Sequence, residues 1–487
     1  MLGIAKEQFI REYSKKVMDG NAVIFAGAGL SQRAGYVNWK ELLSEIADDL
    51  GLKVDREYDL IALAQYHHNQ RRSRAKLNEK LVEEFTKGVQ PTENHTLIAQ
   101  LPIHAVWTTN YDTLIEDAFK AQHKRVDIKI TTENVAQTRA GIDVTVFKMH
   151  GDVSQPHEAV ITKDDYEKYH LRRELFTVRL KGDLVSLTFL FLGFSFTDPN
   201  IDYILSRIKN LLGENIPTHY CIIKQPQLPE NPSPESRADY EYELRKLALR
   251  VDDLKRFGIQ TILINSYDEV TDILKEINRR SFINNIFVSG SAERGTSGFG
   301  LPRLFEFARY LGHEIIQRGY NLVSGYGKGV GTELLAGALE GTYLSASSMR
   351  ERLILRPFPH SIEESRKQQV YSEWRKTMIS LAGFSIFIAG NKVEPDNAAG
   401  VILGQGVMEE FEIGTKEPIL SFPIPVGATG FMANEIWKIV SADLNRFFGS
   451  IDVTQEMVVL GDEKRPDTEL MEAIFTLIDK VRRGLSR

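Results

Sequence analysis

The chain contains 487 residues, of which 42% are hydrophobic and 26% are charged, and its formal net charge is −6. That length exceeds what one hydrophobic core serves and predicts two or three domains of a soluble, globular protein. The negative charge gives no reason to expect nucleic acid as a bulk electrostatic partner, and a single cysteine, Cys221, excludes an intramolecular disulfide and a multi-cysteine zinc site. We therefore expect a cytoplasmic protein.

The N-terminal residues 1–20 place apolar side chains at helical spacing among charged ones and lack the apolar core of a signal peptide. They predict an amphipathic helix. The most apolar run, residues 184–196, is shorter than the ~20 residues that cross a bilayer, and it contains serines and a glycine. We expect it to be the end of a helix followed by a buried strand, with no membrane association.

From Asn21 onward, short apolar runs alternate with amphipathic segments, which is typical of a parallel sheet covered by helices. The predicted strands are residues 22–27, 105–110, 144–150, 188–194, 219–224 and 260–265. Residues 225–239 are rich in proline and polar side chains, so we expect a surface loop there. A helix over residues 269–281 is predicted to end this first unit.

At Asn285 the pattern starts again. Further strands that run into turns or loops are predicted in residues 285–292, 321–333, 352–359, 384–392 and 420–430. The sequence therefore predicts an α/β protein with two Rossmann-like parallel-sheet domains, residues 1–281 and residues 282–487. The two halves share an architecture but show no sequence repeat.

Residues 23–31 read VIFAGAGLS, so a buried strand runs into Gly-Ala-Gly and a hydroxyl. Such a loop can be an ordinary tight turn. It can also let a pyrophosphate approach backbone amides at a helix N-terminus. The loop lacks the third glycine of the dinucleotide fingerprint and the lysine of a P-loop, so by itself it leaves both interpretations open.

Three further strand ends carry polar residues, namely residues 108–112, 150–152 and 193–200. Because the carboxyl ends of parallel strands form the ligand crevice of such sheets, four loops of this kind favour a binding site over turns alone. Taken singly, His150 would be a structural histidine and Asn110 a turn former. Together they favour catalysis, since a histidine of pKa ~6.5 accepts a proton near neutral pH.

The order of Gly-Ala-Gly-x-Ser, Thr-x-Asn-x-Asp and a strand ending in His-Gly resembles the sirtuin family. The resemblance implies that NAD is the ligand and assigns roles to the matching positions. It implies a pyrophosphate cradle of Gly27, Ala28, Gly29 and Ser31, a nicotinamide and ribose site at Asn110 and Asp112, and a general base at His150.

Two departures from that family affect the expected reaction. The chain lacks the four cysteines of zinc-bearing sirtuins, so no metal is expected, and residues 108–112 read TTNYD where deacylases usually show TQNID. The zinc-free branch is associated with cleaving NAD outright, with water as the nucleophile. A protein deacylase and a non-catalytic nucleotide-binding regulator remain as alternatives.

The fourth loop, residues 193–200, follows the strongest predicted strand. Gly193 and Ser195 are predicted to lie beside the adenosine half of NAD. Asp198 and Asn200 are left unassigned, because Asp before Pro commonly caps a helix and a cap is as good an interpretation as ligand contact.

The second unit resembles the SLOG family, which binds nucleotides and related ligands. Its marks are residues 288–291, 324–331 and 425–430. It lacks the Pro-Gly-Gly-x-Gly-Thr of hydrolytic members, so we expect a sensor. The predicted contacts are two phosphate partners, Arg375 and Lys392, a carboxylate for ribose hydroxyls, Glu410, and a small-residue floor of Ser289, Gly290 and Gly325. For each charged residue, a solvated surface position is the alternative.

A zinc-free sirtuin-like unit followed by a SLOG unit resembles the NAD-consuming effectors of the Thoeris anti-phage defence systems. That resemblance implies activation by a cyclic ADP-ribose isomer, which a TIR-domain partner protein makes. It also implies that NAD depletion halts the infected cell, and that the chain assembles into a homotetramer or filament.

Overall fold

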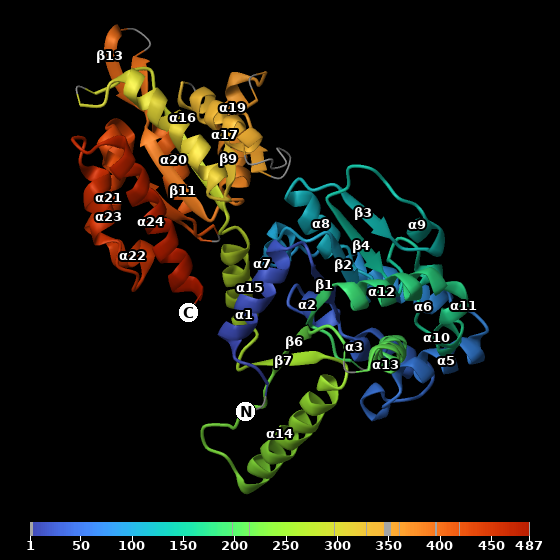
Figure 1. The fold of residues 1–487 in the computed structure, drawn as a ribbon. Coiled ribbons are helices and arrows are strands. Elements are labelled where there is room, and N and C mark those ends of the chain that lie inside the picture. Colours follow the sequence, from blue (N-terminus) through green and yellow to red (C-terminus); the bar gives the residue numbers. More distant parts are fainter. Residues whose placement is uncertain are drawn as a thin grey trace. The chain divides into compact units, whose positions relative to one another are not determined.

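The computed structural model describes residues 3–196, 198–213, 215–296, 298–327, 329–344, 352–359, 361–394, 397–417 and 419–486. These residues form two compact units, Met1–Asn278 (unit 1) and Arg279–Arg487 (unit 2), each built around a parallel sheet (Figure 1). The predicted fold class, α/β with two parallel-sheet units, is confirmed.

The sheet of unit 1 has seven strands in the order β3-β4-β2-β1-β5-β6-β7. They are β1 (Ala22–Ala26), β2 (Ala105–Thr108), β3 (Val126–Lys129), β4 (Val144–Lys148), β5 (Thr188–Leu192), β6 (His219–Lys224) and β7 (Ile259–Ile264). All neighbours pair in parallel, and every residue of the central strands β1 and β5 is buried. The sequence missed β3, a four-residue edge strand with alternating burial and too short an apolar run to signal itself.

Helices cover both faces of this sheet. One face packs against α1 (Lys6–Met18), α7 (Glu93–Gln100), α8 (Leu114–Ala121) and α15 (Asp268–Ser281). The other packs against α12 (Glu174–Ser186), α13 (Pro199–Leu212) and the end of α14 (Pro234–Lys255). The N-terminal helix is thus confirmed, and the most apolar run is the end of α12 followed by β5, as expected.

A third apolar cluster lies among short helices between β1 and β2. These are α3 (Trp39–Leu42), α4 (Ser44–Asp49), α5 (Leu60–Arg71) and α6 (Ala75–Phe85), and they pack with Tyr111, Ala159 and Ile161. The remaining short elements of unit 1 are α2 (Ala28–Gln32), η1 (Val54–Arg56), α9 (Thr132–Ala136), η2 (Pro156–Glu158), α10 (Lys163–Glu167) and α11 (Tyr169–Arg172).

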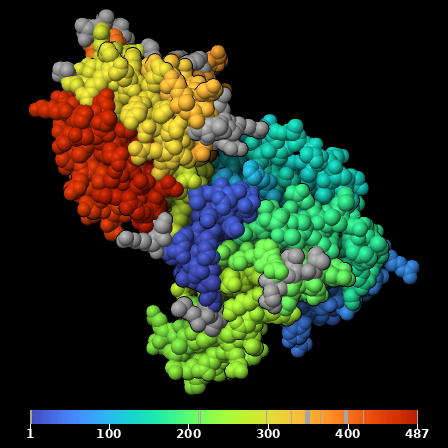
Figure 2. All heavy atoms as spheres, in the orientation of Figure 1, coloured from blue at the N-terminus to red at the C-terminus, as the bar shows by residue number. Residues whose placement is uncertain are grey.

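The predicted surface loop over residues 225–239 is shorter than expected. Helix α14 already begins at Pro234, because Ser233 caps it by accepting a hydrogen bond from the Ser236 amide and proline suits a first helical turn. Only Leu247, Val251 and Leu254 of α14 are buried, so most of the helix lies on the surface of unit 1, as the yellow-green residues of Figure 2 show.

The sheet of unit 2 has the strand order β10-β9-β8-β11-β14, and a two-stranded antiparallel hairpin, β12-β13, lies beside it. The strands are β8 (Asn285–Ser291), β9 (Asn321–Ser324), β10 (Leu353–Leu355), β11 (Phe384–Ala389), β12 (Asn391–Glu394), β13 (Asn397–Leu403) and β14 (Phe422–Pro425). The predicted strand over residues 384–392 is interrupted, because Ala389 and Gly390 both have positive φ and turn the chain from β11 into the hairpin.

The helices of unit 2 are α16 (Leu301–Gln317), α17 (Val330–Leu344), α19 (Glu364–Ile379), α20 (Gln405–Gly414), η3 (Gly427–Thr429), α21 (Phe431–Ala442), α22 (Leu444–Phe448), α23 (Thr454–Gly461) and α24 (Asp467–Ser486). Most of their apolar faces and the sheet form one large core, and the end of α19 packs with Phe287 and Val323 in a second, smaller cluster. Within the described ranges, none of the helices combines the length and apolar character that a membrane crossing requires.

Candidate active site

The glycine loop after β1 lies against the loop after β5. The Gly27 amide donates to Leu192 O (2.8 Å) and the Gly29 amide to Gly193 O (2.9 Å). A Cβ on Gly27 would stand 2.4 Å from Gly193 O, and Gly193 itself has φ +62°. Glycine at positions 27 and 193 therefore allows the backbones of the two loops to lie in close contact. The tight-turn interpretation accounts for Gly27 and for the amide of Gly29.

Asn110, in the loop after β2, is held by the same glycine loop. Its Nδ2 donates to Gly27 O (3.1 Å) and to Ser31 Oγ (2.9 Å). These contacts fix the side-chain amide so that its orientation is defined. The structure therefore brings together three residues that the sequence predicted as one site, Gly27, Ser31 and Asn110.

Two acceptor oxygens beside this loop are buried without a hydrogen-bond partner. They are Asn110 Oδ1 and Asp112 Oδ2, whereas Asp112 Oδ1 accepts from the Leu114 amide at 3.1 Å. Buried polar atoms in folded proteins nearly always find partners. Two open acceptors at one sheet edge are therefore suited to a donor that arrives with a ligand or as water.

His150 follows β4 and has only 3% of its side chain exposed. Its Nε2 lies 3.0 Å from Asp198 Oδ2, although the angles are outside the range of a good hydrogen bond. Asp198 also caps α13, because its Oδ1 accepts from the amides of Asn200 (2.9 Å) and Ile201 (3.3 Å). Asp198 is thus the predicted helix cap and, in addition, the carboxylate that faces His150.

The electrostatics of Asp198 favour its ionised form. Burial raises the pKa of Asp198, but His150 and the amides of Ile201 and Asn200 more than offset this, so the pKa is lowered below its ordinary value. An ionised carboxylate beside the imidazole stabilises the ring when it takes up a proton. Sequence reasoning left this partnership unassigned, and the Asp-Pro at a strand end was its only signal.

A cavity of about 1340 Å³ opens at this edge of the sheet. Its lining includes the predicted residues Ala28, Gly29, His150, Gly193 and Ser195, together with Asp198. Small-molecule pockets usually span ~300–1,000 Å³, so this cavity has room for a dinucleotide. Gly27, Ser31, Asn110 and Asp112 are not part of the lining and support it from behind.

The cavity also takes in residues that sequence reasoning missed. They include Arg33, Trp39, Tyr58, Asn94, Lys163, Tyr166, Lys224, Arg250 and Tyr267. They come from several helices, loops and the end of strand β6, so no spacing in the sequence marks them as a set. One of them secures the β5 loop, since the Arg250 guanidinium donates to Ser195 O. Thr197, within that loop, lies outside the described residues.

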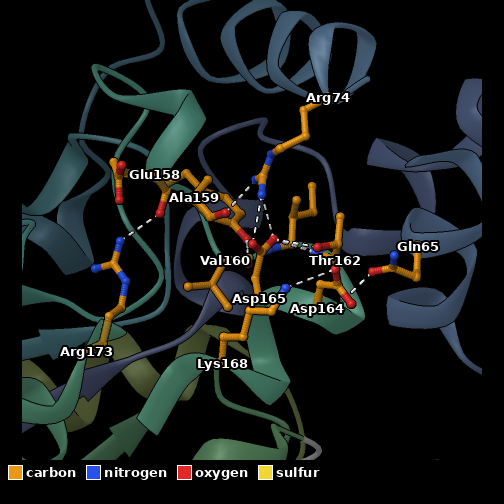
Figure 3. A network of polar contacts seen from close by, with 12 residues as sticks. Gln65, Arg74, Glu158, Ala159, Val160, Thr162, Asp164, Asp165, Lys168 and Arg173 are labelled. Carbon is orange, nitrogen blue, oxygen red and sulfur yellow. Dashed lines mark hydrogen bonds and ion pairs between the residues drawn. The ribbon is translucent and has the colours of Figure 1, made fainter. Parts of the chain in front are cut away.

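A polar network holds the segment that follows His150 (Figure 3). Arg74 donates to both carboxylate oxygens of Asp165 at 2.8 Å and to Ala159 O at 2.6 Å. Asp165 in turn accepts from the Thr162 amide and hydroxyl. The neighbouring Val160 amide donates to His150 O at 2.9 Å. The network thereby fixes both the backbone of His150 and helix α10, which supplies Lys163, Tyr166 and Glu167 to the cavity lining.

Three of the sensor residues predicted in unit 2 meet at the end of β8. The Ser289 hydroxyl donates to Glu410 Oε2, and Arg375 Nε donates to Glu410 Oε1 at 3.3 Å. Arg375 also donates to Glu409 Oε2 at 2.7 Å, and its guanidinium lies 5.2 Å from the centre of the Phe358 ring. Arg375 therefore already has two carboxylate partners within the protein.

The other predicted sensor residues have different settings. A Cβ on Gly290 would lie 2.6 Å from Ile388 O, and one on Gly325 would lie 3.0 Å from Met378 Sδ and from the Phe358 ring, so both glycines serve close packing. Lys392 is exposed in hairpin β12-β13. Lys328, in the glycine-rich loop, lies outside the described residues.

The pKa of Glu410 is shifted in the opposite direction to that of Asp198. Burial raises the pKa of Glu410, and the Ser289 hydroxyl and Arg375 offset this only in part, so the pKa stays above its ordinary value. Elsewhere, the part of the chain that the structure describes holds no group of three or more His, Cys, Asp or Glu side chains arranged for a metal ion.

Known families match the chain in the predicted order. A SIR2-like domain model matches residues 104–250, and a model of the Sir2- and TIR-associating SLOG family matches residues 269–481. NAD(+) hydrolase ThsA of Bacillus cereus (strain MSX-D12) is 41% identical over 477 residues, which cover 98% of each chain. NAD(+) hydrolase ThsA of Acinetobacter baumannii (strain 532279) is 41% identical over 472 residues, 95% of this chain and 96% of that protein. Defense-associated sirtuin 2 of Bacillus subtilis is 25% identical over 285 residues, 56% of this chain and 27% of that protein.

Proposed function

The chain belongs to the ThsA family of NAD(+) hydrolases, and on that premise we propose that it cleaves NAD⁺ to nicotinamide and ADP-ribose in the cavity of unit 1, with His150 and Asn110 as catalytic residues. The prediction of an NAD-cleaving enzyme is confirmed by this membership, and NAD⁺ is its substrate. The observation that carries the site assignment is that the His150–Asp198 pair lines one large cavity, while the Asn110 amide is fixed behind the glycine loop that forms part of its wall.

The bond to be broken joins ribose C1′ to the positively charged nicotinamide ring. The ring leaves as a neutral molecule with the bonding electron pair, so the reaction needs no acid for the leaving group. What develops is an oxocarbenium-like ribose, which water attacks at C1′. His150 accepts the proton that the water loses, and Asp198 stabilises the imidazolium that forms.

Asn110 has a complementary role in this scheme. Because its Nδ2 is committed to Gly27 O and Ser31 Oγ, its open Oδ1 can only accept, and it would orient a ribose hydroxyl or the attacking water. Asp112 Oδ2 would accept from the nicotinamide and ribose side. Ala28 and Gly29 would lie beside the pyrophosphate, and Gly193 and Ser195 beside the adenosine half.

Substitution of each catalytic residue tests the assignment. His150→Ala and Asn110→Ala should each lower kcat for nicotinamide release by at least ~10²-fold, the usual worth of a positioned acid or base. The matched control is His157→Ala, because His157 is exposed and lies only seven residues away. Near-normal turnover in either catalytic variant, with the control equally active, would rule out this site.

For unit 2 we propose that residues 282–487 sense a cyclic ADP-ribose isomer made by a TIR-domain partner protein, while residues 1–281 carry the hydrolase. The match to a Sir2- and TIR-associating SLOG family supports this, as does the meeting of Ser289, Arg375 and Glu410 at one strand end. We further propose a role in anti-phage defence through NAD⁺ depletion, as a homotetramer or filament; the defence-associated name of the Bacillus subtilis relative supports the defence role alone.

One experiment tests this regulation directly. The purified chain is mixed with NAD⁺, with and without cyclic ADP-ribose isomers, and nicotinamide is followed while light scattering reports the assembly state. We expect one isomer to raise turnover at least ~10-fold, which corresponds to a modest allosteric coupling. Equal rates with every isomer and without any would refute the sensor role of unit 2.

A further inference from the structure

A buried lysine, Lys148, contacts the loops that carry the proposed catalytic residues. Lys148 is the last residue of β4, two positions before His150, and its side chain is 0% exposed. It does not line the cavity among the described residues, and its ammonium is committed to contacts within the protein. Sequence reasoning passed over it, and the proposed reaction does not use it.

The Lys148 ammonium contacts both loops that carry the proposed catalytic residues. It donates to Tyr111 O at 3.4 Å and to Asp112 O, the two carbonyls that follow Asn110. It also forms an ion pair with Asp152, two residues after His150. A single charged group thus joins the loop after β2 to the loop after β4.

Other contacts show that this junction is built around the lysine. The Val153 amide donates to Tyr111 O at 3.0 Å, so that carbonyl receives two donors from β4 and the loop that follows it. Glu116 of α8 lies 2.8 Å from Lys148 Nζ and supplies a further negative charge. Burial alone would lower the pKa of Lys148, but Glu116 and Asp152 raise it above its ordinary value, so the ammonium stays charged.

We propose that Lys148 is a positioning residue for NAD⁺ hydrolysis, whose ammonium fixes the loop of Asn110 against the loop of His150. The inference rests on the proposed function of those two residues. A group that only filled the core could be apolar, because well-packed hydrophobic residues often replace buried ion pairs without loss of stability. The two carbonyl contacts are what an apolar replacement cannot reproduce.

The test substitutes Lys148 and separates kcat from KM in the full-length chain. Since a misplacement of ~1 Å can cost a reaction ~10²-fold, Lys148→Met should lower kcat by roughly 10- to 100-fold while KM for NAD⁺ changes less than about threefold. Rates are measured under the conditions that give the unsubstituted chain its highest turnover. Calorimetric titration with ADP-ribose counts the folded sites, so that a loss of folded protein is not read as a loss of kcat.

The matched control is Glu116→Gln. It neutralises one carboxylate that pairs with the Lys148 ammonium but leaves the contacts of that ammonium with both loops. It should keep kcat within about twofold, because it touches neither carbonyl nor Asp152. Lys148→Met leaves Glu116 and Asp152 without their cation and can unfold, so the double variant Lys148→Met/Glu116→Gln is measured as well. It should recover part of the lost thermal stability without recovering kcat. A third variant, Asp152→Asn, keeps the lysine but weakens its tie to the His150 loop, and should lower kcat by about tenfold.

The outcomes separate this inference from the proposed function. If the double variant recovers kcat together with stability, or if Asp152→Asn keeps full kcat, Lys148 only balances charge and the inference is overturned. If His150→Ala and Asn110→Ala keep turnover in the same assay, the proposed site fails instead. Low kcat in the double variant, in Asp152→Asn and in both catalytic variants, with normal kcat in Glu116→Gln, supports both.

Discussion

Each of the two sheets carries its candidate site at the carboxyl ends of its strands, but the polar side chains at the two sites differ in whether they already have partners. In unit 1, the side chains at the site are fixed by neighbours and leave two acceptors, Asn110 Oδ1 and Asp112 Oδ2, without partners. In unit 2, the cation at the site already has partners, because Arg375 donates to both Glu409 and Glu410. One site is open to its ligand and the other is occupied by internal contacts.

This difference suits the two proposed roles. A catalytic site gains from groups that are held in place before substrate arrives, because no reorganisation is then required during the reaction. A ligand that activates must bind two states differently. An anionic ligand at Arg375 would compete with Glu409 and Glu410, so its binding would change contacts between α19 and α20 and could bias a conformational equilibrium.

The largest expected effect tests whether the site around Arg375 in unit 2 binds an anionic ligand. Arg375→Ala and Lys392→Ala should each raise the concentration of activating ligand that is needed on the order of 10²-fold, since a desolvated charge-assisted contact is worth a few kcal/mol. Nicotinamide release and calorimetry are measured on the same preparation. Lys416→Ala, an exposed lysine of the same unit, is the control. Tight binding and full activation of Arg375→Ala would show that the sensor site lies elsewhere.

The next prediction uses the opposite pKa shifts of two carboxyl groups. Burial raises the pKa of Asp165, but Arg74 and the Thr162 hydroxyl lower it by a larger amount. The pKa in the folded protein therefore lies below the pKa in the unfolded chain. Its contribution to stability is therefore present above the unfolded pKa and is lost as pH falls through the folded pKa. Glu410 has a raised pKa, so its contribution is present below the unfolded pKa and is lost as pH rises through the folded pKa.

Near pH 7, Asp165→Asn should thus lower the free energy of unfolding of unit 1 by about 1–3 kcal/mol, the worth of a buried hydrogen-bonded charge. Glu410→Gln should leave the stability of unit 2 unchanged or raise it. Urea unfolding at about pH 7 and about pH 3 checks both signs, because the deficit of Asp165→Asn should shrink only below the unfolded pKa of aspartate, ~3.9. A deficit of equal size at both pH values, or a marked loss in Glu410→Gln at neutral pH, would contradict the contrast.

A smaller effect is expected at the adenosine side of the unit 1 cavity. Ser195 lines the cavity, and its carbonyl is held by Arg250, so a tyrosine there would occupy ligand space. Ser195→Tyr should raise KM for NAD⁺ by about tenfold, equivalent to about 1.4 kcal/mol of lost binding. The matched control, Ser186→Tyr, places the same side chain on the exposed end of α12. An unchanged KM in Ser195→Tyr would refute the adenosine assignment.

The smallest effect tests whether the carboxylates of unit 2 compete with the ligand for Arg375. Glu409→Gln should release Arg375 from one partner and lower the activator concentration needed by about two- to fivefold, the worth of a partly exposed ion pair. Glu412→Gln is the matched control, because Glu412 lies on the same helix as Glu409 and its exposed side chain pairs with Lys416, just beyond the helix end. Weaker activation in Glu409→Gln would mean that Glu409 helps to hold the ligand and does not compete with it.

The sequence by itself determined the class of fold and most strands, because buried parallel strands are local apolar runs that end in small or polar residues. It also determined the order of the motifs, from which the family resemblance followed. It failed where the signal was short or shared, as at edge strand β3, at the start of α14 and at Gly390 after β11.

Only the tertiary structure decided which side chains meet. Asp198 lies 48 positions beyond His150 and caps helix α13, whereas His150 follows strand β4. Their side chains nevertheless lie 3.0 Å apart. Lys148 passed unnoticed in the sequence, and Arg375 had a solvated surface charge as its alternative; each is instead held by two acidic side chains. The physical reason is that apolar periodicity is a property of each segment alone, whereas the partner of a buried charge depends on which loops the strand order brings to one edge of the sheet.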